Sequence, residues 1–165
     1  AWWRDQLGKP LAQRPCGDAL LDLIGKSWSG GETALVALID GWEALLAPRP
    51  LEDAAIARFV EGRATLGAGL GERLGKSIAV SEAGSAGKLW AFADLAVHAR
   101  HDAERSQALE HGMRLAEQGL KLPRTLRPLA VIGGLARRSL RRGGQEMLGD
   151  RLSPLVALRL GLLGR

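Results

Sequence analysis

The chain has 165 residues and a mass of 17.6 kDa. This is the size of one domain, so we expect a single domain over residues 1–165. Hydrophobic residues make up 46% of the chain, which excludes an intrinsically disordered protein. Leu and Ala supply 55 residues, whereas Val, Ile and Thr together supply 14. Because Leu and Ala favour helices and β-branched residues favour strands, the composition predicts an all-α fold.

The single cysteine, Cys16, excludes an intramolecular disulfide and a zinc site built from several thiolates. The first ten residues carry charge from the fourth onward and do not resemble a secretory signal. No segment reaches the roughly 20 consecutive apolar residues of a membrane span. We therefore expect a cytoplasmic protein that is soluble or peripheral to a membrane.

The net charge of +5 is unevenly distributed along the chain. Residues 1–120 hold 13 Lys and Arg against 16 Asp and Glu, whereas residues 121–165 hold 10 against 2. A basic end of this kind suits nucleic acid, an anionic membrane, a diphosphate, or solubility alone.

Apolar spacing predicts four helices in the first half, over residues 2–7, 17–25, 32–46 and 50–74. The first begins with two tryptophans and no capping residue, so we expect further chain before Ala1. The last has Ala64, Gly67, Ala68 and Gly71 at spacings of three and four. Small side chains at this spacing let a second backbone or a ligand come close.

In the second half, a break over 77–87 is expected before a helix that starts at 89 and runs past His98, and 104–120 is also helical. Thr125 is the expected cap of a helix with Pro128 in its first turn, closed by two glycines at 143–144. Ser153 and Pro154 are typical of the start of a last helix. The total is seven or eight helices.

Two groups of polar residues are candidates for chemistry. Asp94, His98 and Asp102 lie at i, i+4 and i+8, so one continuous helix presents all three on one face. This row is either a weak site for a divalent cation or diphosphate, or a solvated face.

The second group is a basic helical surface formed by Arg137, Arg138, Arg141 and Arg142. Contact with an anionic membrane, or solubility, accounts for this run. We expect no nucleic-acid binding, because base recognition requires polar and aromatic groups beside the arginines and the chain has neither Tyr nor Asn.

Four segments, in this order, resemble the squalene/phytoene synthase family. They are AWWRDQL at 1–7, ALIDGWEALL at 37–46, RFVEGRATLGAGLGERLG at 58–75 and AGKLWAFADLAVHARHD at 86–102. The resemblance implies a helical bundle of the isoprenoid-synthase type around an apolar cavity. The cavity lining that it implies consists of Ala64, Gly67, Ala68, Gly71, Trp90 and Phe92.

Active members of that family hold Mg²⁺ and prenyl diphosphates with two aspartate-rich motifs. The first motif belongs upstream of the paired tryptophans, so we expect this chain to be the C-terminal two thirds of a longer domain. At the second motif, Asp94, His98 and Asp102 stand where active members have one Asn and two Asp, and Ala91 stands at a Gln position. Leu45 replaces a further Asp.

We therefore expect a non-catalytic relative that binds an isoprenoid diphosphate or lipid, or acts as an assembly or interaction protein. Two alternatives stay open. One is an active Mg²⁺-dependent prenyltransferase whose first aspartate motif lies upstream. The other is a basic helical module for a membrane surface or nucleic acid.

Overall fold

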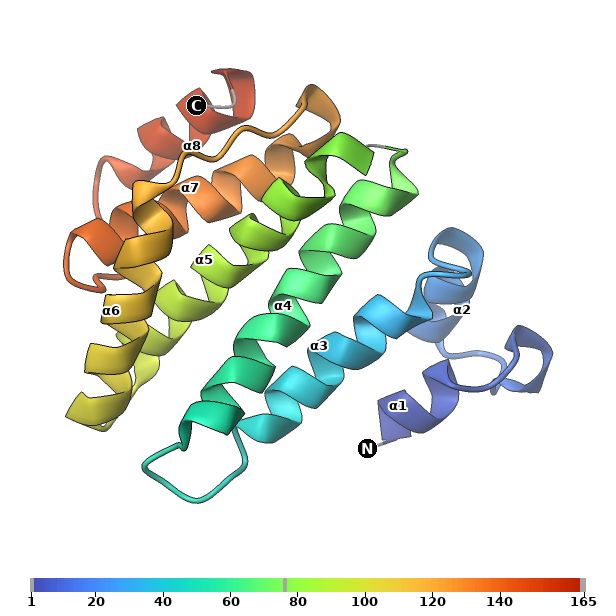
Figure 1. Cartoon of the computed structure of the whole chain (residues 1–165). Helices are drawn as coiled ribbons and strands as arrows, with labels where there is room; N and C mark the ends of the chain where they lie inside the picture. Colours follow the sequence, from blue (N-terminus) through green and yellow to red (C-terminus); the bar gives the residue numbers. More distant parts are fainter. Residues whose placement is uncertain (1, 76, 164–165) are drawn as a thin grey trace.

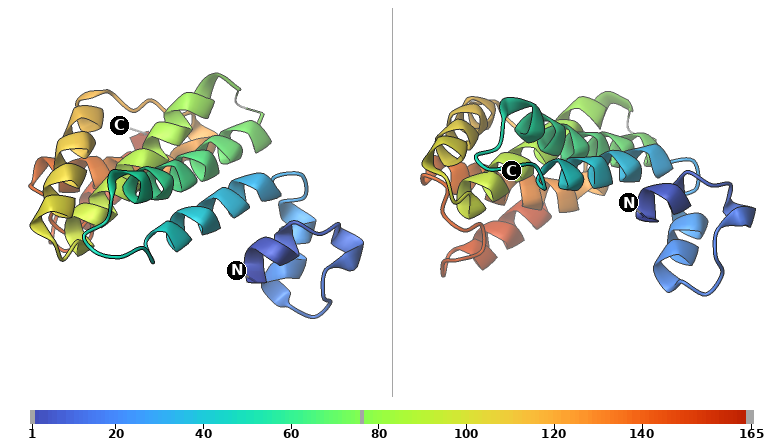
Figure 2. Two further views of the ribbon diagram at one scale, coloured as in Figure 1. Left: turned by 60° about the horizontal axis from the view of Figure 1, so that its bottom comes forward. Right: turned by 90° about the horizontal axis from the view of Figure 1, so that it is seen from below.

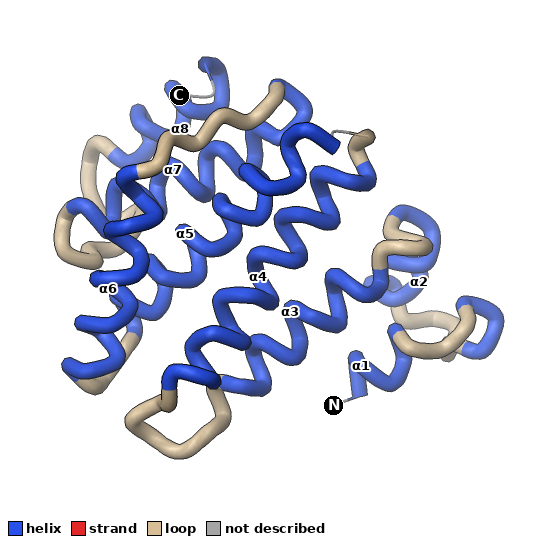
Figure 3. Tube along the Cα trace, in the orientation of Figure 1, coloured by secondary structure: helices blue, strands red, loops and turns tan. Residues whose placement is uncertain are grey.

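The computed structural model describes residues 2–75 and 77–163, and within these ranges the chain is helical with no strand (Figure 3). The α-helices are α1 (Trp2–Leu7), α2 (Ala19–Ser27), α3 (Glu32–Ala44), α4 (Asp53–Arg73), α5 (Val80–His98), α6 (Asp102–Glu117), α7 (Arg127–Arg141) and α8 (Ser153–Leu163). Short 3₁₀ turns lie at Leu11–Gln13, Ser77–Ala79 and Arg124–Leu126. The all-α prediction is confirmed, with a helix count at the top of the expected range.

Four helices, α3, α4, α5 and α7, lie side by side in a row (Figure 1). Helix α8 extends the row beyond α7, while α6 packs on α5 and α7. Helices α1 and α2 lie at the opposite end of the molecule from α8, as the turned views also show (Figure 2). No helix in the described part of the chain is both long and apolar enough to cross a membrane.

Several helix ends follow from local sequence as expected. Asp18 caps α2 by accepting hydrogen bonds from the backbone N–H groups of Leu20 at 3.0 Å and Leu21 at 2.9 Å. Helix α7 stops where Gly143 and Gly144 take φ values of +74° and +75°, which glycine adopts without strain. The expected cap at Thr125 is wrong, because α7 begins at Arg127 with no side-chain cap.

The small residues of α4 form a contact between helices, and this corrects the predicted cavity. A Cβ placed on Gly67 would lie only 2.2 Å from the carbonyl oxygen of Ala83 in α5. Gly71 approaches Val80 of α5 in the same way, and Ala68 contacts Gly84. Since backbone of α5 fills the space beside this stripe, which includes the buried Ala64, it does not line a hollow.

Helix α5 begins at Val80, nine residues before the expected start at 89. The Ser and Gly residues between 81 and 87 predict a break, but they lie inside the helix. Gly87 explains why small residues are needed there. A Cβ on it would lie 2.1 Å from the carbonyl oxygen of Arg63 in α4. The gain from close packing of α4 on α5 therefore outweighs the weak helix propensity of these residues.

Candidate functional site

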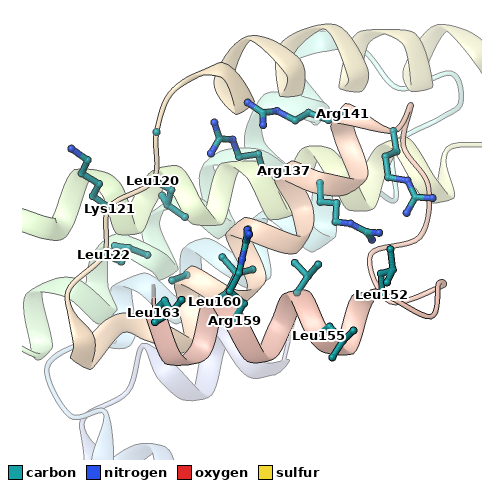
Figure 4. A pocket seen from close by; sticks show the side chains of 16 residues that line it. Leu120, Lys121, Leu122, Arg137, Arg141, Leu152, Leu155, Arg159, Leu160 and Leu163 are labelled. Carbon is teal, nitrogen blue, oxygen red and sulfur yellow. The ribbon is translucent and has the colours of Figure 1, made fainter. Parts of the chain in front are cut away.

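An open groove of about 860 Å³ lies at the α7–α8 end of the molecule. Its walls come from α7, α8 and the segment at 119–122 that follows α6, and Figure 4 shows their side chains gathering around one space. Eight apolar side chains contribute to it, together with the backbone of Gly119 and Gly134: Leu120, Leu122, Ala130, Leu152, Leu155, Val156, Leu160 and Leu163. Six cationic side chains contribute as well: Lys121, Arg137, Arg138, Arg141, Arg142 and Arg159.

Arg137 and Arg141 project from one face of α7 toward the end of α6. Arg137 Nε donates a hydrogen bond to the carbonyl oxygen of Ala116 at 2.6 Å, and Arg141 donates to the same oxygen at 3.2 Å. That carbonyl belongs to the last turn of α6, where backbone acceptors have no partner within the helix. Burial lowers the pKa of Arg137, and the nearby charge of Arg141 lowers it further. Two like charges are thus held together beside the groove.

Arg138 and Arg142 lie on the adjacent face of α7 and share one carboxylate. Arg138 donates to Asp150 Oδ2 at 2.6 Å, and Arg142 donates to the same oxygen. These two guanidinium groups hold the pKa of Asp150 far below its usual range. The other oxygen of Asp150 accepts from the backbone N–H groups of Leu152 and Ser153, so Asp150 also caps the start of α8.

The remaining two cations, Lys121 and Arg159, have no ion pair among the residues described. Arg159 stands on α8 and Lys121 on the segment before α7 (Figure 4). Because Asp150 is the one carboxylate in the described structure that pairs with these six cations, the groove carries a net positive charge. The groove therefore combines apolar and cationic lining residues, a combination that suits an amphiphile with a negative head.

The structure places the four predicted basic residues, Arg137, Arg138, Arg141 and Arg142, in this groove. They do not form a uniform solvated surface, because two hold Asp150 and two hold the end of α6.

Asp94, His98 and Asp102 do not lie on one continuous helix, and this part of the prediction is wrong. Helix α5 ends at His98, and Ala99 turns to an extended conformation with φ −61° and ψ 129° before α6 begins at Asp102. His98 Nδ1 lies 3.1 Å from Asp94 Oδ1. No group of three or more His, Cys, Asp and Glu residues in the described ranges is placed to hold a metal ion.

The Asp94 carboxylate is paired with the guanidinium group of Arg63, in place of the metal ion that the prediction would put beside it. Arg63 donates to Asp94 Oδ2 at 2.7 Å and is only 2% exposed. Its guanidinium carbon lies 4.0 Å from the ring centroid of Trp90 and 4.4 Å from that of Phe59. Burial lowers the pKa of Arg63, and the charge of Asp94 opposes that shift. A guanidinium packed among aromatic rings beside this carboxylate does not fit a magnesium site.

Trp90 and Phe92 also depart from the predicted cavity lining. Trp90 packs on Arg63, whereas Phe92 lies on another side of α5 and stacks on His111, with ring centroids 6.0 Å apart. The two side chains therefore face different neighbours.

Sequence reasoning missed Lys121, Arg159 and the apolar lining residues of the groove. Arg159 is the only charged residue within α8, and an isolated cation in a leucine-rich helix is a signal that could have identified it. The apolar lining gives no such signal, because it is assembled from separate elements. No family model, curated protein or solved structure matches the chain.

Proposed function

We propose that this protein binds an isoprenoid or lipid with an anionic head in the groove between α7 and α8, without catalysing a prenyl transfer. The observation that carries the proposal is the groove itself, which leucines and cationic side chains line together. An isoprenoid diphosphate or a phospholipid has the matching two-part chemistry. The resemblance of the sequence to squalene/phytoene synthases favours the isoprenoid.

The non-catalytic part of the proposal is supported by the environment of Asp94. Ionisation of a prenyl diphosphate requires preorganised positive charge at the leaving group. In squalene/phytoene synthases, Mg²⁺ held by carboxylates supplies this charge. Here the Asp94 carboxylate is committed to Arg63 and His98. Incubation with Mg²⁺ and farnesyl or geranylgeranyl diphosphate is therefore expected to release no diphosphate. Turnover that Asp94→Ala abolishes would contradict this.

Calorimetric titration tests binding with three compounds that separate head from tail. Geranylgeranyl diphosphate carries both parts, geranylgeraniol only the tail, and inorganic diphosphate only the head. We expect the complete amphiphile to bind at least about tenfold more tightly than either part, because each part uses only the apolar or only the cationic lining residues. Equal affinity for geranylgeranyl diphosphate and inorganic diphosphate would show that the tail does not contact the apolar lining residues of the groove, which would refute this part of the proposal.

A pair of double variants tests the location. Lys121→Glu with Arg159→Glu reverses two exposed groove cations that have no ion pair in the described structure, so the fold should persist. Lys26→Glu with Arg100→Glu reverses two exposed cations outside the groove and is the matched control. We expect the first variant to lose at least about tenfold in affinity and the control to lose less than about twofold. Equal losses would place the ligand elsewhere.

A further inference from the structure

The outward face of α8 is apolar, and no helix within the described ranges covers it. Helix α8 packs on α7 through the buried Leu160, which lies against Gly134. On the opposite side, Leu155, Leu158 and Leu162 follow one another at i, i+3 and i+7, so they share one helix face. Their exposed fractions are 62%, 59% and 60%. Figure 1 shows α8 at the edge of the row of helices.

The last quarter of the chain exposes further leucines and carries many cations. The exposed leucines of the last quarter of the chain are Leu148, Leu152, Leu155, Leu158, Leu162 and Leu163. Arg159 on α8 and Arg151 just before this helix are also exposed. Residues 121–165 contain ten basic and two acidic residues, and Arg138 and Arg142 neutralise one of the acids, Asp150. The result is an apolar face within a strongly positive region.

We propose that α8 docks this protein on an anionic lipid bilayer, with the helix lying in the plane of the interface. The leucines on its outward face enter the boundary between headgroups and acyl chains, while the exposed arginines contact lipid phosphates. Charge complementarity selects this partner, because a patch of uncovered leucines in a cationic region of the chain matches the apolar interior and the negative surface of such a bilayer. Leu155 belongs both to this face and to the groove, so docking brings the groove mouth to the lipid surface.

Co-sedimentation with vesicles tests the proposal. The protein is mixed with vesicles of phosphatidylcholine, or of phosphatidylcholine with phosphatidylglycerol, at low and high salt. The double variant Leu158→Ser with Leu162→Ser removes two leucines that do not line the groove, and Leu46→Ser with Ile78→Ser removes two exposed apolar residues elsewhere. We expect tight binding only to the anionic vesicles, weakened by salt. We expect the α8 variant to bind at least about tenfold more weakly and the control to bind unchanged.

A probe on the helix reports insertion directly. Cys16 is the only cysteine and is exposed, so Cys16→Ser frees the chain for labelling at one chosen position. An environment-sensitive dye on Leu158→Cys should shift its emission to the blue with anionic vesicles, whereas the same dye on Leu46→Cys should not. These shifts would support insertion of α8. Equal shifts at both positions, or none at either, would overturn it.

Three further results would overturn the proposal: no binding of the wild type to anionic vesicles, binding that survives the loss of Leu158 and Leu162, or a dimer in solution that this double variant converts to a monomer without any vesicle binding. The last result would assign the face to a second copy of the chain. Groove binding is measured separately with dissolved geranylgeranyl diphosphate and no vesicles, so failure of either proposal can be recognised independently of the other.

Discussion

Substitution of Gly67 by alanine tests whether α4 and α5 touch backbone to backbone. The added Cβ would lie 2.2 Å from the carbonyl oxygen of Ala83 and 2.9 Å from its carbonyl carbon. Because both are backbone atoms, neither can rotate away, and the two helices must separate. Overpacking of this kind costs about 3 kcal/mol at the upper end of its usual range. Alanine recovers about 1 kcal/mol of helix propensity. We therefore expect Gly67→Ala to lower the free energy of unfolding by about 2 kcal/mol.

The matched control is Gly84→Ala, on the other side of the same contact. Its Cβ would lie 3.5 Å from the carbonyl oxygen of Ala64, an ordinary contact distance. Only the propensity gain remains, so we expect Gly84→Ala to be about 0.5–1 kcal/mol more stable than the wild type. Urea unfolding followed by helical circular dichroism measures the roughly 3 kcal/mol difference between the variants. Stabilities within about 0.5 kcal/mol of each other would refute direct contact between the helices.

Two further predictions concern the ion pairs. Arg63→Met should lower the free energy of unfolding by about 2–3 kcal/mol in the same assay, since Asp94 loses its buried partner. Arg58→Met, at an exposed position of α4, should change it little, and equal effects would contradict a special role for Arg63. Asp150→Asn keeps an acceptor that can cap α8 but frees Arg138 and Arg142, so geranylgeranyl diphosphate should bind up to about fivefold more tightly. The pKa of Asp150 is lower in the folded protein than in the unfolded chain, where it is about 3.9. Its carboxylate therefore adds stability above about pH 4, and this should disappear as the pH falls further. The free energies of unfolding of the wild type and Asp150→Asn are compared over the acid range. A difference between them that does not change with pH would contradict this expectation.

Local chemistry was enough to predict most helices. The Pro128 position in the first turn of α7 and the glycines after α7 depend on neighbours in the chain, and both are confirmed. The break over 77–87 is wrong because Gly87 is required by the close approach of α4, which a single segment does not reveal.

The candidate site was only partly predictable for the same reason. The cationic run on α7 stands out in the sequence, but its role depends on a carboxylate at 150 and a carbonyl at 116 that folding brings to it. The small residues of α4 signal a close approach, and the sequence does not say whether a ligand or a helix makes it. Periodicity placed Asp94 and Asp102 on one face, yet the extended residue at 99 separates them.

The order of helices along the row follows the order of the chain over α3, α4 and α5, and α7 and α8 are also adjacent. Most tertiary contacts therefore join segments that are close in sequence, and short loops have to be closed before the contacts form. Proteins with such local topology fold quickly, within microseconds to milliseconds for small domains. The contact between α4 and α5 is the most extensive one between two helices, so we expect this hairpin to form early and the outer helices to assemble on it.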